Sequence, residues 1–476
     1  MDREIVIYKG DEHRAKMEKQ FFRKDFFAGV YCRAYKLLTE IEREMEAYGR
    51  EIEKNNNRLI RYQGMGNNII IFCGGRGQGK TSAMQSFAKC LDGTYMDERR
   101  DKDPERLEFV SEIDPGKYEV VDSIDPSAME SGESILGVLI SRLFFRLEEH
   151  IKNDGHLSKD DRQFLQDKNE IVKLFETCYA NIACIKSGKE ANCAQDDLQK
   201  LSQMGSSAKL KENLHDLIKK YLAMEAGRRH CGDDSCRYLI IPIDDADLMT
   251  KKLFRLCEDI RNYLSIPNVI IFMAVDYEQL LHAIYQKYLK QYKVMREAEA
   301  DKYFYEECHK MAAKYLEKIF PAMHRIDLPQ LDDMLAERLD HIKFDYKIQN
   351  GEKEYGSAFA DVDFGQCNDL QEQLLKILYS RTGMIFRGQD QSIHPFMPHT
   401  FRELTHWIKL LYNMHEIDCD RDVYRKFQKL EDLDDSLVDK LRENIQAVKQ
   451  YFVNYWCEKY LDASVAGIFQ RRFQTV

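Results

Sequence analysis

Apolar residues recur at two spacings along the chain. Between residues 60 and 330, short and nearly continuous apolar runs alternate with stretches in which apolar residues return every three or four positions. Such runs are typical of strands buried on both faces, as in a parallel sheet covered by helices. The predicted strands are Asn68–Cys73, Tyr118–Ile124, Tyr238–Ile243, Asn268–Val275 and Met323–Leu328. The pattern therefore predicts one α/β domain with five core strands.

A helical pattern precedes this domain, over residues 14–55. Its apolar positions are spaced 4, 3, 4, 3 and 4 residues apart, with charged residues between them: Ala34, Leu38, Ile41, Met45, Tyr48 and Ile52. The spacing predicts a helix with one apolar stripe, ended by Asn55–Asn57. The stripe packs either on its own domain or on a second subunit, and we favour the first interpretation. Residues 1–59 are thus expected to form an N-terminal helical segment.

Two other regions are helical in pattern. Residues 151–235 are polar, lie between the second and third strands, and contain Gly/Ser breaks near residues 187 and 205. They predict a helical insertion into the 60–330 domain. After Pro329 the strand signal fades, so residues 331–476 are expected to form a C-terminal helical lid domain.

Composition narrows the function classes. The chain has 476 residues, of which 44% are hydrophobic, and a formal net charge of −10, which argues against a general nucleic-acid coat. Its apolar runs are too short to span a bilayer, and its first residues lack a signal-peptide pattern. The 13 cysteines are scattered, as expected for reduced core thiols in a cytoplasmic protein. A zinc site at His230, Cys231 and Cys236 would need a second pair of ligands at zinc-ligand spacing, and the sequence shows none. We therefore expect a plain loop there.

The first strand leads into a phosphate-binding motif. Gly74-Gly75-Arg76-Gly77-Gln78-Gly79-Lys80-Thr81 reads G-x-x-x-x-G-K-[ST], with a strand before it and a helix after it. Glycines let the backbone curl until successive N–H groups point at phosphate oxygens, and the helix N-terminus adds its positive end. Lys80 is expected to reach the β- and γ-phosphates, and Thr81 to hold Mg²⁺. The predicted nucleotide-binding residues are Gly74, Gly75, Arg76, Gly77, Gln78, Gly79, Lys80, Thr81 and Ser82.

Acidic residues follow two of the other strands. Asp244 and Asp245 stand directly after Tyr238–Ile243, at the edge where open parallel sheets bind ligands. We assign Asp244 to the Mg²⁺ shell and Asp245 to the attacking water, with Asp247 as the rival for either role. Asp276 ends the next strand and either orients the water, as a sensor residue does, or caps the helix that follows.

Arg402 is a further catalytic candidate. Thr400 and Glu403 have the spacing of a capping box and open a helix. Arg402 then lies in the first helical turn, where the helix dipole disfavours a cation, and a local misfit of this kind often marks a functional position. The arginine either reaches the γ-phosphate from a helical lid or pairs with a surface carboxylate.

Taken in order, these motifs resemble the AAA+-related P-loop NTPases, in the branch that includes the KAP and STAND families. The resemblance covers about residues 60–415 and rests on five segments: residues 74–81, 240–247, 268–276, 314–329 and 401–404. It implies a P-loop ATPase fold with strand order 5-1-4-3-2, ATP and Mg²⁺ as ligands, and a nucleotide lid. Residues 118–126 and 260–264 are similar to ATPases of bacterial anti-phage defence systems, one of which pairs its ATPase with an adenosine deaminase.

The sequence also departs from those families. KAP proteins often carry transmembrane helices between the two nucleotide motifs, whereas the insertion predicted here is polar. Many AAA+ members also have Glu where this chain has Asp245. No arginine stands at an unambiguous arginine-finger position, for which Arg261, Lys318 and Arg325 are the candidates.

Three functions fit these features. The first is an Mg²⁺-dependent ATPase that acts as a motor or switch in a homo-oligomeric ring, with an effector partner such as a deaminase or a nuclease. The second is an ATP-gated signalling or scaffold module with little turnover. The third is a DNA-remodelling ATPase, against which the acidic net charge counts.

Overall fold

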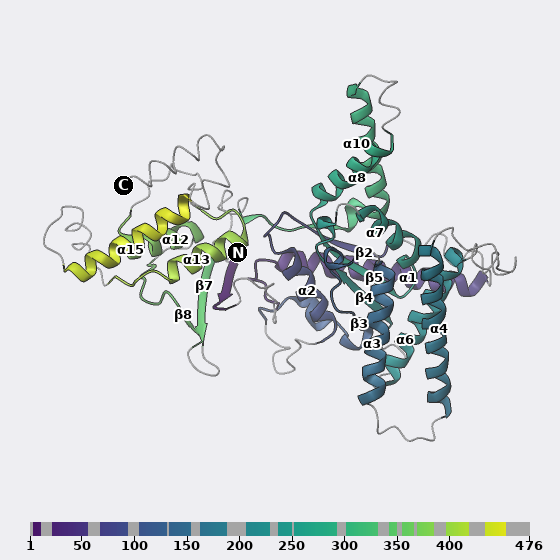
Figure 1. Ribbon diagram of the computed structural model, residues 1–476. Helices are drawn as coiled ribbons and strands as arrows, with labels where there is room; N and C mark the ends of the chain where they lie inside the picture. The colour runs from purple at the N-terminus through teal and green to yellow at the C-terminus, as the bar shows by residue number, and fades with distance from the viewer. Residues whose placement is uncertain are drawn as a thin grey trace.

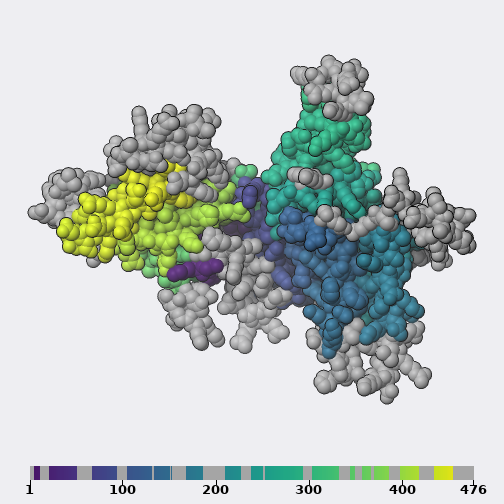
Figure 2. Space-filling view, in the orientation of Figure 1, coloured from purple at the N-terminus to yellow at the C-terminus, as the bar shows by residue number. Residues whose placement is uncertain are grey.

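In the computed structural model the chain forms two lobes, an α/β core and a C-terminal lobe (Figure 1). Figure 2 shows the C-terminal lobe in light green and yellow beside the blue and teal core. The structure describes residues 3–10, 21–55, 67–93, 104–130, 133–153, 162–187, 206–228, 237–249, 252–292, 301–331, 342–349, 355–365, 369–384, 397–417 and 434–453. Among these residues, no helix combines the length and the apolar character needed to cross a membrane.

The core is built on an all-parallel sheet. Its five strands are β2 (Ile69–Cys73), β3 (Tyr118–Val120), β4 (Tyr238–Ile243), β5 (Val269–Val275) and β6 (Arg325–Asp327). They lie in the order β3-β4-β5-β2-β6. Numbered along the chain and read from the β6 edge, this order is 5-1-4-3-2. The α/β class is confirmed, and all five predicted strands are present.

The strands are buried on both faces because helices cover both. Alternate residues of β2 belong to different clusters: Ile70 and Phe72 pack with α1 (Ala28–Asn55) and α2 (Lys80–Leu91). Ile69 and Ile71 pack with the helices of the opposite face. The period-two alternation of a strand thus explains why the sequence shows an unbroken apolar run.

Helix α1 begins later than expected. It starts at Ala28, whereas residues 21–27 form turns and an isolated bridge from Phe22 to Arg106. Residues 14–20 lie outside the described part. The stripe from Ala34 to Met45 is buried against the sheet and α2, so packing on its own domain is confirmed for these residues, and Tyr48 is buried as well.

Helices also fill the connection between β3 and β4. They are α3 (Ile135–Asn153), α4 (Arg162–Ser187) and α6 (Ser206–Arg228). The helical connection therefore begins at Ile135, before the expected 151–235. Apolar residues of all three helices join the cluster on one face of the sheet, so the insertion extends the core.

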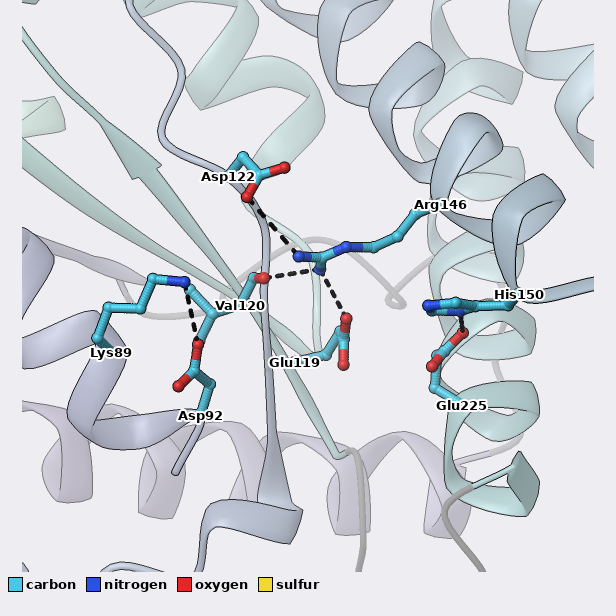
Figure 3. A network of polar contacts seen from close by, with 8 residues as sticks. All are labelled: Lys89, Asp92, Glu119, Val120, Asp122, Arg146, His150 and Glu225. Carbon is cyan, nitrogen blue, oxygen red and sulfur yellow. Dashed lines mark hydrogen bonds and ion pairs between the residues drawn. The ribbon is translucent and has the colours of Figure 1, made fainter. Parts of the chain in front are cut away.

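A buried polar network fastens α3 to the sheet and to α6 (Figure 3). Arg146 Nη1 donates to Glu119 Oε1 and to the carbonyl of Val120, each at 2.7 Å. One turn further along α3, His150 Nδ1 lies 2.7 Å from Oε1 of the buried Glu225. These contacts satisfy polar groups that burial would otherwise penalise.

The rest of the core consists of helices around β5 and short turns. A helical hairpin, α8 (Tyr277–Gln291) and α10 (Asp301–Ile319), lies between β5 and β6 and protrudes from the core (Figures 1 and 2). The remaining segments are α7 (Leu253–Asp259), the π-turn η6 (Ile260–Leu264) and the 3₁₀ turns η2 (Glu108–Ser111), η3 (Pro115–Lys117), η4 (Pro126–Ala128), η5 (Ala246–Leu248) and η7 (Ala322–His324).

The C-terminal lobe contains a small sheet as well as helices. Strand β1 (Arg3–Tyr8) pairs in parallel with β7 (Ile342–Gln349), which pairs antiparallel with β8 (Tyr355–Ser357). Helices α12 (Leu370–Thr382), α13 (Phe401–Tyr412) and α15 (Asp435–Tyr451) complete it.

This sheet corrects the expectation that residues 1–59 and 331–476 are helical. The start of the chain belongs to the C-terminal lobe, where Ile5 and Ile7 are buried with Phe344 and Tyr346. These pairs alternate with polar or less buried residues, which is the pattern of strands with one buried face. The chain therefore crosses between the lobes twice, before α1 and after β6.

Candidate functional site

The predicted phosphate loop joins β2 to α2. Gly77 and Gly79 have φ angles of +84° and +87°, a backbone region in which glycine is favoured. The loop is braced from inside, because Gln78 Oε1 accepts a hydrogen bond from the Gly75 amide at 2.6 Å. Arg76 is exposed at the loop surface. The curled backbone is the conformation that the glycine pattern predicts.

Helix α2 directs its N-terminus at the loop. Lys80, its first residue, is buried, and its Nζ donates to the Gly75 carbonyl at 3.2 Å. The first turn of α2, Lys80–Ala83, is described in full and holds no acidic side chain, so nothing there neutralises the positive end of the helix dipole. Thr81 and Ser82 lie in the same turn. The arrangement suits an anion such as a phosphate group.

The loop and the acidic strand tip meet directly. Thr81 Oγ1 donates to Asp244 Oδ1 at 2.9 Å, and the Asp245 amide donates to the same oxygen at 3.0 Å. Burial raises the pKa of Asp244 to about 6, which the bond from Thr81 partly offsets. Two residues 163 positions apart are thus joined because β2 and β4 flank β5 and end at the same edge of the sheet.

The Thr81–Asp244 pair fits a magnesium ion. A hydroxyl and a carboxylate are the hard oxygen ligands that Mg²⁺ prefers, and protein sites usually supply only one or two of them. Burial penalises the negative charge of Asp244, and a bound cation would compensate that charge. The donor set therefore agrees with the predicted metal residues.

The other acidic residues at this edge differ in their surroundings. Asp245 is partly exposed and has φ +50°, a left-handed conformation that few residues other than glycine, asparagine and aspartate adopt. Asp247 lies in η5 and is only 5% exposed. Burial raises its pKa, while the charge of Lys80 and the amides of Asp247 and Asp276 lower it. Asp247 thus lies within electrostatic reach of the phosphate-loop lysine.

Asp276 caps helix α8. Its Oδ1 accepts from the amides of Glu278 and Gln279 at 3.1 and 3.2 Å, and its Oδ2 accepts from Gln279 Nε2 at 3.2 Å. The capping interpretation of this residue is therefore confirmed. Its role as a sensor stays a prediction, with the side chain already engaged in the cap.

Helix α13 reaches the phosphate loop from the other lobe. The Arg402 amide donates to the Gly77 carbonyl at 3.3 Å, and Thr400 caps the helix by accepting from the Glu403 amide. A Cβ at Gly77 would lie 3.1 Å from Arg402 Cβ and 3.3 Å from Thr400 Oγ1. The Arg402 side chain is exposed. Arg402, which the sequence indicated as a candidate, thus lies on the loop. That its side chain contacts a phosphate stays a prediction.

An aromatic cluster supports this junction, and the sequence did not indicate it. The rings of Phe26 and Phe27, which precede α1, lie 4.6 and 5.5 Å from the ring of Phe401. The Phe27 ring also lies 2.8 Å from the position of a Cβ at Gly79. Phe27 therefore lies against both the loop and helix α13, a position that depends on three distant segments. The only sequence signal is the aromatic pair itself.

The arginine-finger candidates of the core are placed as follows. The Arg325 guanidinium stacks on Tyr277 at 3.8 Å and donates to the carbonyl of Phe320. Arg261 lies 3.9 Å from Glu258, one turn away. Lys318 is exposed on α10. Arg325 is thus held within its own chain, while Arg261 and Lys318 are nearer to solvent.

The plain loop predicted around His230, Cys231 and Cys236 is not tested by the structure. All three lie outside the described residues. Within the described residues, no group of three or more His, Cys, Asp or Glu side chains forms a metal site.

No protein-family model matches the sequence, and no curated protein is significantly similar to it. Function is therefore inferred from the geometry of this site and from the resemblance of the motifs.

Proposed function

We propose that this chain is an Mg²⁺-dependent ATPase of the AAA+-related P-loop class, of the KAP or STAND type. The observation that carries the proposal is the hydrogen bond from Thr81 to Asp244. It links a glycine-rich phosphate loop to the acidic tip of a neighbouring strand, the two elements that a triphosphate and its metal need together.

Each residue has a role in this proposal. The loop amides and the α2 N-terminus bind the phosphates, and Lys80 neutralises charge on the β- and γ-phosphates. Thr81 and Asp244 hold Mg²⁺, which when bound supplies positive charge next to the transferred phosphoryl group. An acidic neighbour of Asp244 orients the water. Hydrolysis on such a site needs positioning and charge neutralisation more than covalent chemistry.

The α13 contact supports a switch. Since Arg402 and Thr400 touch Gly77, a change in loop conformation acts directly on the C-terminal lobe. Arg402 is proposed to sense the γ-phosphate from this lobe. Assembly into a ring, a role in bacterial anti-phage defence and an effector such as a deaminase or nuclease are proposed from the resemblance alone.

A second candidate is an ATP-gated signalling module with little turnover. The position of Arg325 favours it, because the guanidinium of this arginine-finger candidate is already held by the Tyr277 ring and the Phe320 carbonyl of its own chain. ATP binding without turnover, even with a partner protein or phage material, would support this candidate.

Turnover by Lys80→Ala tests the proposal. Loss of one preorganised charge at the phosphates is expected to lower ATP hydrolysis about 100-fold or more. Lys89→Ala is the matched control, because Lys89 lies on the same helix and pairs with Asp92 at its far end. The control is expected to hydrolyse ATP at the wild-type rate. Robust hydrolysis by the Lys80→Ala protein refutes the site assignment.

A further inference from the structure

One carboxylate oxygen of Asp247 is buried without a hydrogen-bond partner among the described residues. This oxygen is Oδ1, and the residue is 5% exposed. A buried polar atom left unpaired destabilises the folded state, because it loses its hydrogen bonds to water and gains none in exchange. Native proteins retain such atoms mainly where a ligand, a water or a catalytic step uses them.

The surroundings of Asp247 place its carboxyl near the phosphate site. Turn η5 begins two residues after Asp244 and packs against β5, and the backbone amide of Asp276 at the β5 tip lowers the pKa of the Asp247 carboxyl. The charge of Lys80 acts on the same carboxyl. Asp247 is therefore held between two strand tips, beside the lysine that is proposed to bind the β- and γ-phosphates.

Asp245 is placed differently. Its amide is used to bond Asp244, its backbone is left-handed, and its side chain is partly exposed. A solvated carboxylate is poorly preorganised for one water molecule, whereas a buried carboxylate on a turn packed against the sheet is fixed in place before the substrate arrives.

We infer that Asp247, and not Asp245, positions the water that attacks the γ-phosphate. The inference rests on the proposed ATPase function. The water oxygen forms a bond to the γ-phosphorus while the bond from that phosphorus to the β–γ bridging oxygen breaks, and the electron pair stays on ADP. The water proton passes to the Asp247 carboxylate and then to solvent, so the products are ADP and inorganic phosphate.

A purely structural role for Asp247 makes different predictions. If its carboxyl only ties η5 to the β5 tip, replacement will lower the stability of the fold and the affinity for nucleotide together with the rate. If it orients water, the rate falls while the affinity for Mg·ATP is kept and the stability of the fold is not lowered.

The experiment compares Asp247→Asn with Asp245→Asn in the full chain. Asparagine keeps the size of the side chain and one oxygen that can accept a hydrogen bond, and it removes the negative charge. Three quantities are measured: the ATP turnover rate, the dissociation constant of Mg·ATP by calorimetry, and the midpoint of thermal unfolding. Asp247→Glu is the third variant, since it restores a carboxylate.

We expect Asp247→Asn to lower turnover about 100-fold or more with the Mg·ATP dissociation constant unchanged within about threefold. Asp245→Asn is expected to keep turnover within about threefold, and Asp247→Glu to recover at least about tenfold over the asparagine variant. Turnover by Asp247→Asn at the wild-type rate overturns the inference and leaves the ATPase proposal intact. Loss of affinity or stability in step with the rate also overturns it. A wild-type protein that binds Mg·ATP without hydrolysing it refutes the ATPase proposal and this role together.

Discussion

Replacing Asp244 by asparagine is predicted to stabilise the nucleotide-free protein while abolishing its response to Mg²⁺. Asp244 is 8% exposed, and burial raises its pKa from 3.8 to about 6. Asparagine carries no charge, and its Oδ1 can still accept from Thr81 and from the Asp245 amide. The variant therefore keeps both hydrogen bonds and removes the buried charge.

The direction in which stability changes with pH follows from proton binding to Asp244. A carboxyl whose pKa is higher in the folded than in the unfolded chain binds its proton more tightly when folded, so it favours the folded state at low pH. That stabilisation is lost as the pH rises from about 4 to about 6. The difference in pKa between the unfolded and the folded chain, from 3.8 to about 6, corresponds to a cost of about 3 kcal/mol at pH 7.5 and about half of that at pH 5. Asp244→Asn avoids this cost.

Urea denaturation of the nucleotide-free protein at pH 5 and pH 7.5 measures the effect. The variant is expected to be more stable than the wild type by about 3 kcal/mol at pH 7.5, and by about half as much at pH 5. Asp245→Asn, next to it and partly exposed, is the control and is expected to change stability by less than about 0.5 kcal/mol at either pH. A variant that is less stable than the wild type at pH 7.5, or a difference that does not change with pH, would refute the reasoning.

Two further predictions concern the supports of the site. Gly79→Ala is expected to lower the free energy of unfolding by about 1–3 kcal/mol, because φ is +87° and the new Cβ would lie 2.8 Å from the Phe27 ring. Gly29→Ala, on α1 with open space around its Cβ, should be neutral or slightly stabilising in the same thermal denaturation, and equal effects of the two would contradict this. Arg146→Met is expected to cost about 3–5 kcal/mol, because it removes the guanidinium from the buried Glu119 (Figure 3). The double variant Arg146→Met/Glu119→Leu should recover most of that loss in urea denaturation, and a further loss would show that the cost does not come from leaving the Glu119 carboxylate unpaired.

The core sheet could be predicted from the sequence because its strands are buried on both faces. Tyr238–Ile243 appears as predicted, and Asn268–Val275 begins one residue later, at Val269. Between helical segments of an α/β domain, a short unbroken apolar run is seldom anything but a strand buried in the sheet. The curled backbone of the loop at residues 74–81 could be predicted for a similar reason, since the positions of its glycines are dictated by local backbone geometry.

The small sheet of the C-terminal lobe could not be found in this way. Strand β1 is short, and its partner β7 lies more than 330 residues away. The alternation in each strand is clear only after the two are paired. Non-local pairing of this kind leaves a weak local signal, and tertiary contacts decide whether it forms a strand.

The sequence predicted which residues lie together in the candidate site better than it predicted the role of each residue. Thr81 and Asp244 meet as expected, since parallel strands end at one edge. Asp276 proved to be a helix cap, which its spacing before α8 also allowed. Neither the burial of Asp247 nor the contact of Phe27 with Gly79 is encoded by any local pattern, because each depends on how separate segments pack.

The most direct test is the structure of the full chain with Mg²⁺ and a slowly hydrolysed ATP analogue. We predict that the β- and γ-phosphates lie inside the loop of residues 74–81, with Mg²⁺ bound by Thr81 Oγ1 next to the Asp244 carboxylate. A nucleotide bound elsewhere, or a metal ion that contacts neither Thr81 nor Asp244, would contradict it.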